Sequence, residues 1–281
     1  DSADNLIEQT ISYDANLAIQ EEAAKLSAAP TIIAVNNGSG FVFDQTNFVG
    51  AVDPDGAAWW QGWTLPNTLT TPAMETPQPA SFVSCNGDST VCTVSGVVDS
   101  DYTFVAGVEW RLDGEVLVGQ GNETVNSAAD VQAVRDAGVT LTIRPGVHVR
   151  AFDTGSLLVT RGSKLLANGT AESPITFSSL GDDDLDGEGE WGGVIIQCFA
   201  PQYGQGATGA CFGAGTVCNV VGEGGTVVGN YGGNDPADNS GSLRYVRIAE
   251  GGKVAGPNNE INGLTLQGVG HGTTLEYIQV H

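Results

Sequence analysis

A run of carboxylates between two apolar stretches, GDDDLDGEGE at residues 181–190, holds the side chains best suited to binding a metal ion. Alternate Asp residues followed by a Gly match the start of a calcium-binding loop, in which the carboxylates turn toward one ion. The twelfth position of such a loop is Gly193 here, so a Glu within the run would have to replace the usual bidentate ligand. A solvated acidic corner is the alternative. We expect Ca²⁺ as the cofactor, with the ligands Asp182, Asp184, Asp186, Glu188 and Glu190.

A second oxygen-rich loop, NDPADN at 234–239, precedes Arg244, Arg247, Glu250 and Lys253. Turn formation explains the loop without a metal, because Asn, Asp and Pro favour turns. Carboxylates near basic residues would suit a polysaccharide lyase, and a glycoside hydrolase would need two carboxyl groups about 5–10 Å apart. However, Arg244 and Arg247 are three residues apart in a predicted strand and would point to opposite faces. No G-x-S-x-G motif is present either, so we expect no complete catalytic site.

Three tryptophans, Trp59, Trp60 and Trp63, lie within five residues of one another. Such a cluster could stack on the rings of a carbohydrate. More often such a cluster packs a loop onto the core, and we favour packing over stacking.

The five cysteines indicate disulfides rather than a metal site. Cys85 and Cys92 flank a polar loop between two β-like runs, which predicts a hairpin disulfide. One further disulfide is expected among the other three cysteines, either Cys211–Cys218 or Cys198–Cys218. No CxxC motif supports zinc. Disulfides point to an oxidising compartment and hence to an extracellular or cell-surface protein.

The charge balance excludes two classes of partner. The chain of 281 residues has 33 acidic and 10 basic residues, a net charge of −23. Nucleic acids and anionic lipids bind Lys/Arg patches, so neither is expected as a partner. No run of about 18 apolar residues is present, so no membrane-spanning helix is expected.

The chain divides by composition into four parts, of which three precede residue 139. Residues 1–65 predict a helix at 15–26, short strands and the Trp-rich loop. Residues 66–80 are rich in Pro and Thr and read as a linker. Residues 81–138 form a β-rich region ending in a short helix, which Ser127 and Asp130 would cap and Gly138 would end.

Residues 139–281 contain short strands that recur after turns, with a Gly- and Cys-rich insertion at 198–240. Three strands per coil and roughly 20–25 residues per coil are typical of a solenoid. We therefore predict an all-β, right-handed parallel β-helix, with the short helix covering its open end. An antiparallel sandwich is the alternative. The predicted strands lie at 139–143, 147–151, 157–160, 164–167, 175–178, 194–197, 243–248, 264–267 and 275–280.

Several of these segments are familiar, among them VTLTIRPGVHV at 139–149, LLVTRGSKLLA at 157–167 and WGGVII at 191–196. With PITFSS at 174–179, YGGNDP at 231–236 and the runs at 239–248 and 274–281, they resemble secreted bacterial right-handed β-helix surface proteins and lipoproteins of unassigned activity. The resemblance covers residues 93–281 and implies the fold shared with pectate lyases.

Two departures from that family bear on assembly. FVGAVD at 48–53 with WWQGW at 59–63 lies near the N-terminus, whereas the resemblance places such a segment near the C-terminus. More coils would also follow His281. These departures suit a permuted chain, a processed chain, or pieces that meet in an assembly.

Our first functional hypothesis is a secreted structural protein that self-associates end to end as an extracellular filament, surface layer or matrix component. The alternative is a β-helix that binds or cleaves a polysaccharide. An aromatic and acidic groove along the parallel sheet would distinguish the alternative from the first hypothesis.

Overall fold

The computed structural model describes residues 53, 55–67, 70–153, 155–181, 184–202, 211, 217–224, 228–256 and 259–281. The chain forms two compact units, Asp1–Gln61 and Gly62–His281. The predicted helix at 15–26 and the strands predicted before residue 53 lie outside the described residues.

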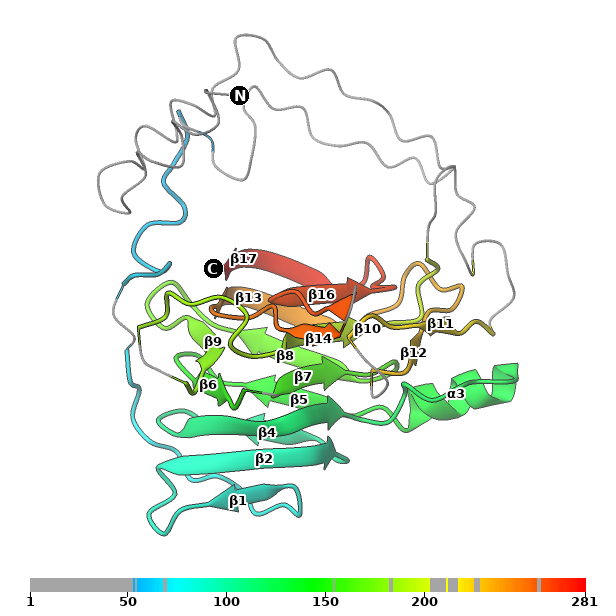
Figure 1. Ribbon diagram of the computed structural model, residues 1–281, viewed down its shortest axis with the longest axis horizontal. Coiled ribbons are helices and arrows are strands. Elements are labelled where there is room, and N and C mark those ends of the chain that lie inside the picture. The colour runs from blue at the N-terminus through cyan, green and yellow to red at the C-terminus, as the bar shows by residue number, and fades with distance from the viewer. Residues whose placement is uncertain are drawn as a thin grey trace. The chain divides into compact units, whose positions relative to one another are not determined.

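The second unit is built from short strands and one described helix (Figure 1). The N-terminal elements are β1 (Val83–Cys85), β2 (Val91–Val98), β3 (Tyr102–Phe104), β4 (Glu109–Val118) and α3 (Ala128–Asp136). Next come β5 (Thr140–Ile143), β6 (His148–Ala151), β7 (Ser156–Val159), β8 (Lys164–Asn168), β9 (Ile175–Ser179) and β10 (Gly193–Gln197). The last are β11 (Val220–Val221), β12 (Asn230–Tyr231), β13 (Gly241–Ile248), β14 (Val254–Gly256), β15 (Asn259–Glu260), β16 (Leu264–Gln267) and β17 (Thr274–Val280).

Within the described residues, 13 strands join into one hydrogen-bonded sheet, in which only the β1–β2 pair is antiparallel. The sheet wraps into three parallel ladders, because β2, β4, β13 and β17 each bend and serve two of them. Sheet A contains the first halves of β2 and β4, then β6, β9 and the second halves of β13 and β17. Sheet B contains the second halves of β2 and β4, then β7, β10 and β16. Sheet C contains β3, β5, β8 and the first halves of β13 and β17.

This arrangement is a right-handed parallel β-helix, as the sequence predicted. Alternate side chains of the solenoid strands point inward, and those of the core, such as Leu112, Phe177 and Ile196, are almost fully buried. The inward column provides the hydrophobic stabilisation, since no single coil could bury its own apolar face. The outward side chains determine the surface of each sheet.

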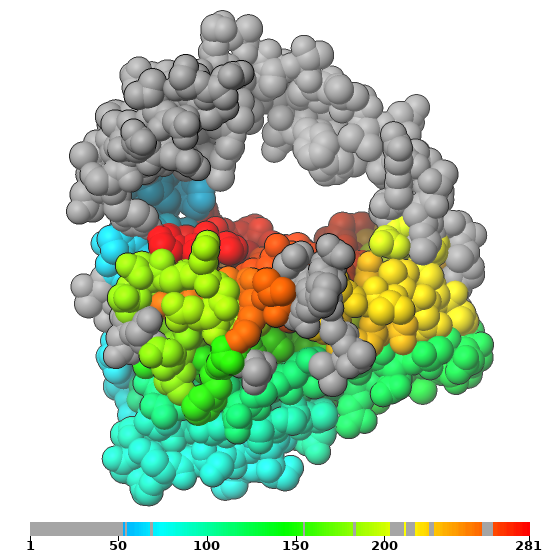
Figure 2. All heavy atoms as spheres, viewed as in Figure 1, coloured from blue at the N-terminus to red at the C-terminus, as the bar shows by residue number. Residues whose placement is uncertain are grey.

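The helix forms as predicted but lies elsewhere than expected. Ser127 caps α3 by accepting a hydrogen bond from the Asp130 backbone N–H, and the helix ends just before Gly138. It lies beside the solenoid instead of across its end, because β2, β3 and β4 precede it and already pair with later coils. The coils therefore begin at β2, before residue 139. Figure 2 shows the green helix next to the yellow insertion.

Candidate functional site

The outer face of sheet A carries a row of polar side chains, one from each of three successive coils. Glu109 on β4, His148 on β6 and Thr176 on β9 are register partners. Together with residues 70–72 they line a hollow of about 260 Å³, here called the sheet A hollow. Neighbouring parallel strands lie about 4.8 Å apart, so these groups are evenly spaced along the solenoid axis.

The polar groups of the sheet A hollow lie at different depths. The Glu109 side chain is 30% exposed, whereas Thr176 is 1% exposed. The Thr176 hydroxyl has no hydrogen-bond partner among the described residues. A buried polar group without a partner costs roughly 1–3 kcal/mol, so this hydroxyl would gain most from a ligand.

A second row, Arg111, Arg150 and Ser178, runs beside the first. Arg111 Nε donates to Glu109 Oε1 at 2.5 Å, and Arg150 Nη1 lies 3.9 Å from Glu109 Oε2. His148 Nε2 lies 2.8 Å from Ser178 Oγ. These contacts hold Glu109 and His148 in place. They also put two of the chain's 10 basic residues on one face of a strongly acidic protein.

One wall of the sheet A hollow is formed by a segment that runs along the solenoid, here called the strap and defined as residues 62–67 and 70–78. The Thr70 hydroxyl donates to the Glu172 carbonyl at 3.3 Å, and the Glu75 backbone N–H donates to the Ala106 carbonyl at 2.9 Å. At Gly107 a Cβ would lie 2.3 Å from the strap backbone, so only glycine fits there. The described part of the predicted linker thus packs on the coils.

The outer face of sheet B is apolar where that of sheet A is polar. Leu158 and Ile195 point outward but are fully buried, because Val228 and Ile261 pack over them. The segments before β12 and β16 therefore cover this face with a second apolar cluster. Glu115, at the β4 end of this face, has its pKa raised by burial to about 7.

Two polar clusters hold the covering insertion in place. Arg161 is fully buried, and its guanidinium donates to four backbone carbonyls, those of Gly121, Glu123, Cys218 and Gly232. Burial lowers the pKa of Arg161 to about 10. By linking the segment before α3 to the insertion, this side chain fixes both against the solenoid.

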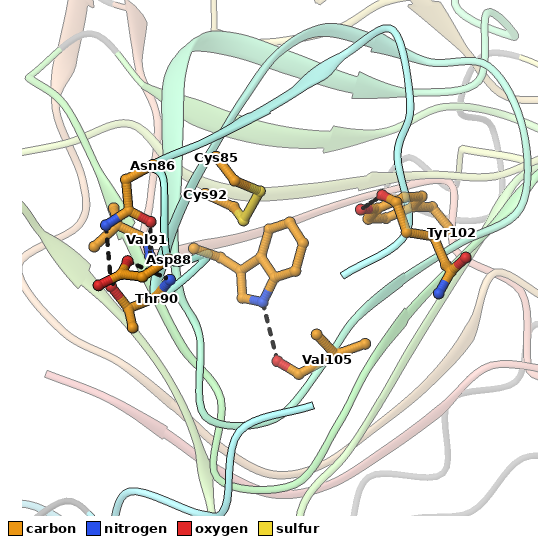
Figure 3. Close-up of a disulfide and its surroundings, with 10 residues drawn as sticks. Cys85, Asn86, Asp88, Thr90, Val91, Cys92, Tyr102 and Val105 are labelled. Atoms are coloured by element: carbon orange, nitrogen blue, oxygen red, sulfur yellow. Dashed lines mark hydrogen bonds between the residues drawn. A yellow bond between two sulfur atoms is a disulfide. The ribbon is translucent and has the colours of Figure 1, made fainter. Parts of the chain in front are cut away.

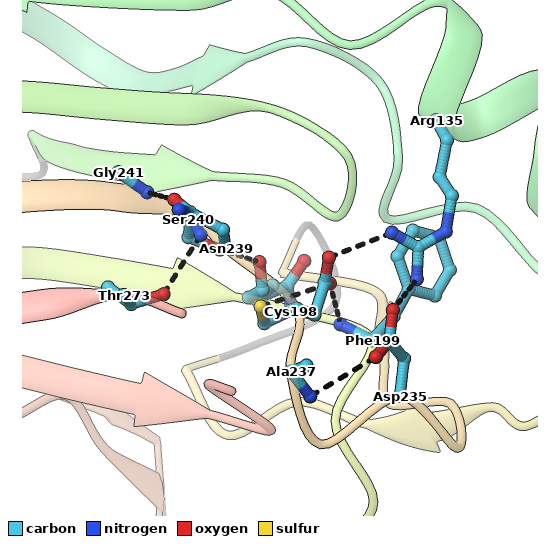
Figure 4. A network of polar contacts seen from close by, with 11 residues as sticks. Arg135, Cys198, Phe199, Asp235, Ala237, Asn239, Ser240, Gly241 and Thr273 are labelled. Carbon is cyan, nitrogen blue, oxygen red and sulfur yellow. Dashed lines mark hydrogen bonds and ion pairs between the residues drawn. The ribbon is translucent and has the colours of Figure 1, made fainter. Parts of the chain in front are cut away.

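The second cluster joins the helix to the loop at 234–239 (Figure 4). Arg135 donates to Asp238 Oδ1 at 2.8 Å and to Asp235 Oδ2 at 2.9 Å. Asp238 Oδ2 accepts the Phe199 N–H at 2.6 Å and the Cys198 thiol at 3.1 Å. Burial alone would raise the pKa of Asp238, but these hydrogen bonds and Arg135 outweigh it and lower the pKa. The oxygen-rich loop thus binds a guanidinium.

Two disulfides form, Cys85–Cys92 and Cys211–Cys218. The first joins β1 to β2 (Figure 3). Trp110 on β4 is the register partner of Cys92, and its indole N–H donates to the Val105 carbonyl at 3.1 Å. The structure therefore forms Cys211–Cys218 and not Cys198–Cys218. Cys198 is a buried free thiol, and burial together with Asp238 raises its pKa to about 11.

The predicted calcium ligands lie in the loop between β9 and β10. Asp182 is outside the described residues, Asp184 Oδ1 accepts the Asp186 N–H at 3.4 Å, and Glu188 and Glu190 follow on the same loop. Among the described residues no three His, Cys, Asp or Glu side chains are grouped to hold a metal ion. Calcium binding by this loop stays a prediction.

The three tryptophans divide between the two units, with Trp59 and Trp60 in the first and Trp63 in the second. Trp63 is 1% exposed and meets Tyr245 edge to face at 5.4 Å between ring centroids. The ring of Trp63 is thus packed into the protein, which is the core-packing alternative that the sequence favoured. Trp59 is 36% exposed and contacts Trp60; stacking by these two residues stays a prediction.

A comparison with protein families finds one match. A model of a pectate-lyase like beta helix domain matches residues 118–281. No curated protein and no solved structure matches the chain. No helix of the described residues is long and apolar enough to cross a membrane.

Proposed function

We propose that this chain, which belongs to the family of pectate-lyase-like β-helix domains, binds a polysaccharide on the outer face of sheet A. The observation that carries the proposal is the row Glu109–His148–Thr176, which lines a hollow and ends in a buried hydroxyl without a partner among the described residues. A sugar ring offers several hydroxyls in fixed directions. A row of carboxylate, imidazole and hydroxyl groups is well suited to receive them.

The walls and neighbours of the hollow support a carbohydrate ligand in two further ways. Pro72 and Pro174 line the hollow beside the polar row, and their aliphatic rings suit the apolar faces of a sugar. Arg111 and Arg150 lie on the same face, and guanidinium groups bind carboxylate or sulfate with favourable geometry. We therefore expect an acidic polysaccharide to bind more tightly than a neutral one.

The test is to measure, by calorimetry, binding of the purified protein to a panel of polygalacturonate, a sulfated glucan and dextran. Glu109→Gln should weaken binding about tenfold, which corresponds to the loss of one hydrogen bond to a charged group. Glu276→Gln is the matched control, because Glu276 also pairs with an arginine, Arg244, but on sheet C. Equal binding by both variants would refute the site.

The same panel separates binding from cleavage. Incubation of the bound polysaccharide with the protein, with and without Ca²⁺, should leave its length unchanged if the protein only binds. Unsaturated products would identify a lyase, and new reducing ends without unsaturation would identify a hydrolase.

A second proposal is self-association as an extracellular or cell-surface structural protein. It is supported by the apolar side chains of the last described coil, where Leu266 is 45% and Val280 is 56% exposed. These residues continue the core columns of Ile196 and Ile248. A second copy would bury them. The two disulfides agree with an oxidising compartment.

Light scattering across a concentration series tests self-association. A mass that rises with concentration, and falls to one chain in Leu266→Lys, would support it. A constant mass of one chain would contradict it.

A further inference from the structure

We propose that the sheet A hollow binds the end of a polysaccharide chain and not a stretch inside it. This inference rests on the proposed function and specifies which part of the ligand is recognised. It follows from the shape of the site along the solenoid axis.

The outward side chains of sheet A become steadily more buried over the three coils of β4, β6 and β9. In the first coil with polar rows, Glu109 is 30% and Arg111 is 33% exposed. One coil further, Arg150 is 11% exposed. Thr176 and Ser178 on the third coil are both 1% exposed. A ligand can therefore enter from the side of β4, and the space narrows toward β9.

The strap closes the far end of the row. Arg247, the register partner of Thr176 on the next coil, is 1% exposed. Its Nε donates to the Trp63 carbonyl and its Nη1 donates to the Asn67 carbonyl at 3.3 Å. The Leu65 backbone N–H donates to Gln279 on the last strand at 2.7 Å. Strap backbone thus lies over the row at the point where a longer ligand would have to continue.

The residues that line the hollow support a site that is closed at its β9 end. They come from the strap, from Thr90 just before β2, and from the coils of β4, β6 and β9, whereas Arg247 does not line the hollow. Its volume of about 260 Å³ lies just below the roughly 300–1,000 Å³ of ordinary small-molecule sites. Such a space holds the last part of a chain, and the Thr176 hydroxyl at its deep end is placed to bind the hydroxyl of a terminal sugar.

The experiment compares long and short forms of the same probe, size-fractionated polygalacturonate, at equal mass. End binding predicts that shortening the chains tenfold raises the amount of protein bound at saturation about tenfold, because the number of ends rises tenfold. An unchanged amount bound per mass would overturn the inference and leave the proposed function standing. The absence of binding at any length would overturn both for this ligand class, and dextran and a sulfated glucan are then tested in the same way.

A variant at the deep end gives an independent readout. Thr176→Val keeps the shape of the side chain and removes a hydroxyl that has no partner among the described residues, so the melting temperature should be unchanged or higher. Affinity for short chains should fall about tenfold. Thr142→Val on the outer face of sheet C is the matched control and should change neither quantity. Full affinity in Thr176→Val would contradict the assignment of the deep end.

Discussion

The outer faces of sheets A and B belong to the same solenoid and yet have opposite characters. On sheet B the outward residues are apolar, and the insertion packs over them to make a second core at Leu158 and Ile195. On sheet A the outward residues are polar, and a hollow remains open above Glu109 and His148. A parallel β-helix fixes its inward side chains, whereas its outward side chains are free to serve either stability or binding.

This comparison predicts that equal substitutions on the two faces have unequal effects. Changes on sheet B should alter stability and leave binding intact. Changes on sheet A should alter binding and leave stability nearly intact.

The largest effect on stability is expected from Ile195→Ala on sheet B. The truncation leaves a cavity beneath Val228 and Ile261 and should lower the free energy of unfolding by about 3 kcal/mol. Urea unfolding, monitored by circular dichroism, measures this loss of stability. A loss below about 1 kcal/mol would mean that the insertion does not form a second core.

A somewhat smaller effect is expected from Asp238→Asn, which weakens the link between α3 and the insertion. Near neutral pH the loss should be about 2 kcal/mol, because charged hydrogen bonds to Arg135 and to the Phe199 N–H are lost or weakened. The pKa of Asp238 is lowered in the folded protein. Its stabilising effect is therefore present above the pKa of the unfolded chain and is lost as the pH falls through the folded pKa.

Unfolding of the wild type and of Asp238→Asn between pH 3 and pH 7 tests this assignment. The difference between the two proteins should shrink below a pH of about 4. A constant difference would exclude the carboxylate of Asp238 as its source.

Glu115→Gln should raise the free energy of unfolding, whereas the two preceding substitutions lower it. The folded pKa of Glu115 is raised to about 7 from an ordinary value of 4.5, so the folded state holds a proton that the unfolded chain releases. Stability is therefore lost as the pH rises between these values. Above pH 7 the variant should gain about 1 kcal/mol, a figure reduced for the partial exposure of the side chain. Equal stability of both proteins at pH 8 would contradict the assignment.

The smallest effect on stability is expected from Arg111→Ala on sheet A. Arg111 is 33% exposed and pairs with Glu109 at the surface, and such pairs contribute about 0.5 kcal/mol. Binding of polygalacturonate should nevertheless weaken several-fold. A large stability loss here would remove the distinction between the two faces.

The strands of the solenoid could be predicted because their signal is local. Apolar runs such as 164–167 and 264–267 end in turn residues, and the capping pair Ser127 and Asp130 marks α3. The corner at Tyr245 could not be predicted. Tyr245 has a φ of 47°, which few non-glycine residues adopt, so 243–248 reads as one strand although it serves two sheets. Arg244 and Arg247 consequently lie on different sheets.

The candidate site was missed for a related reason. Glu109 and Arg111, His148 and Arg150, and Thr176 and Ser178 are each two residues apart, which is the outward spacing of a strand. That pattern was present in the sequence, but only the register of β4, β6 and β9 brings the three pairs together. The outer face of sheet B is covered largely by the insertion. The insertion has no regular spacing of apolar residues from which its packing on sheet B could be predicted.

A crystal structure of the protein with a bound oligogalacturonate would test the central claim most directly. We predict that the oligosaccharide occupies the sheet A hollow, with its terminal sugar beside Thr176 and the rest of the chain passing over Glu109 toward β2. An oligosaccharide bound on sheet B, or one that runs across the strap without ending at Thr176, would contradict the account.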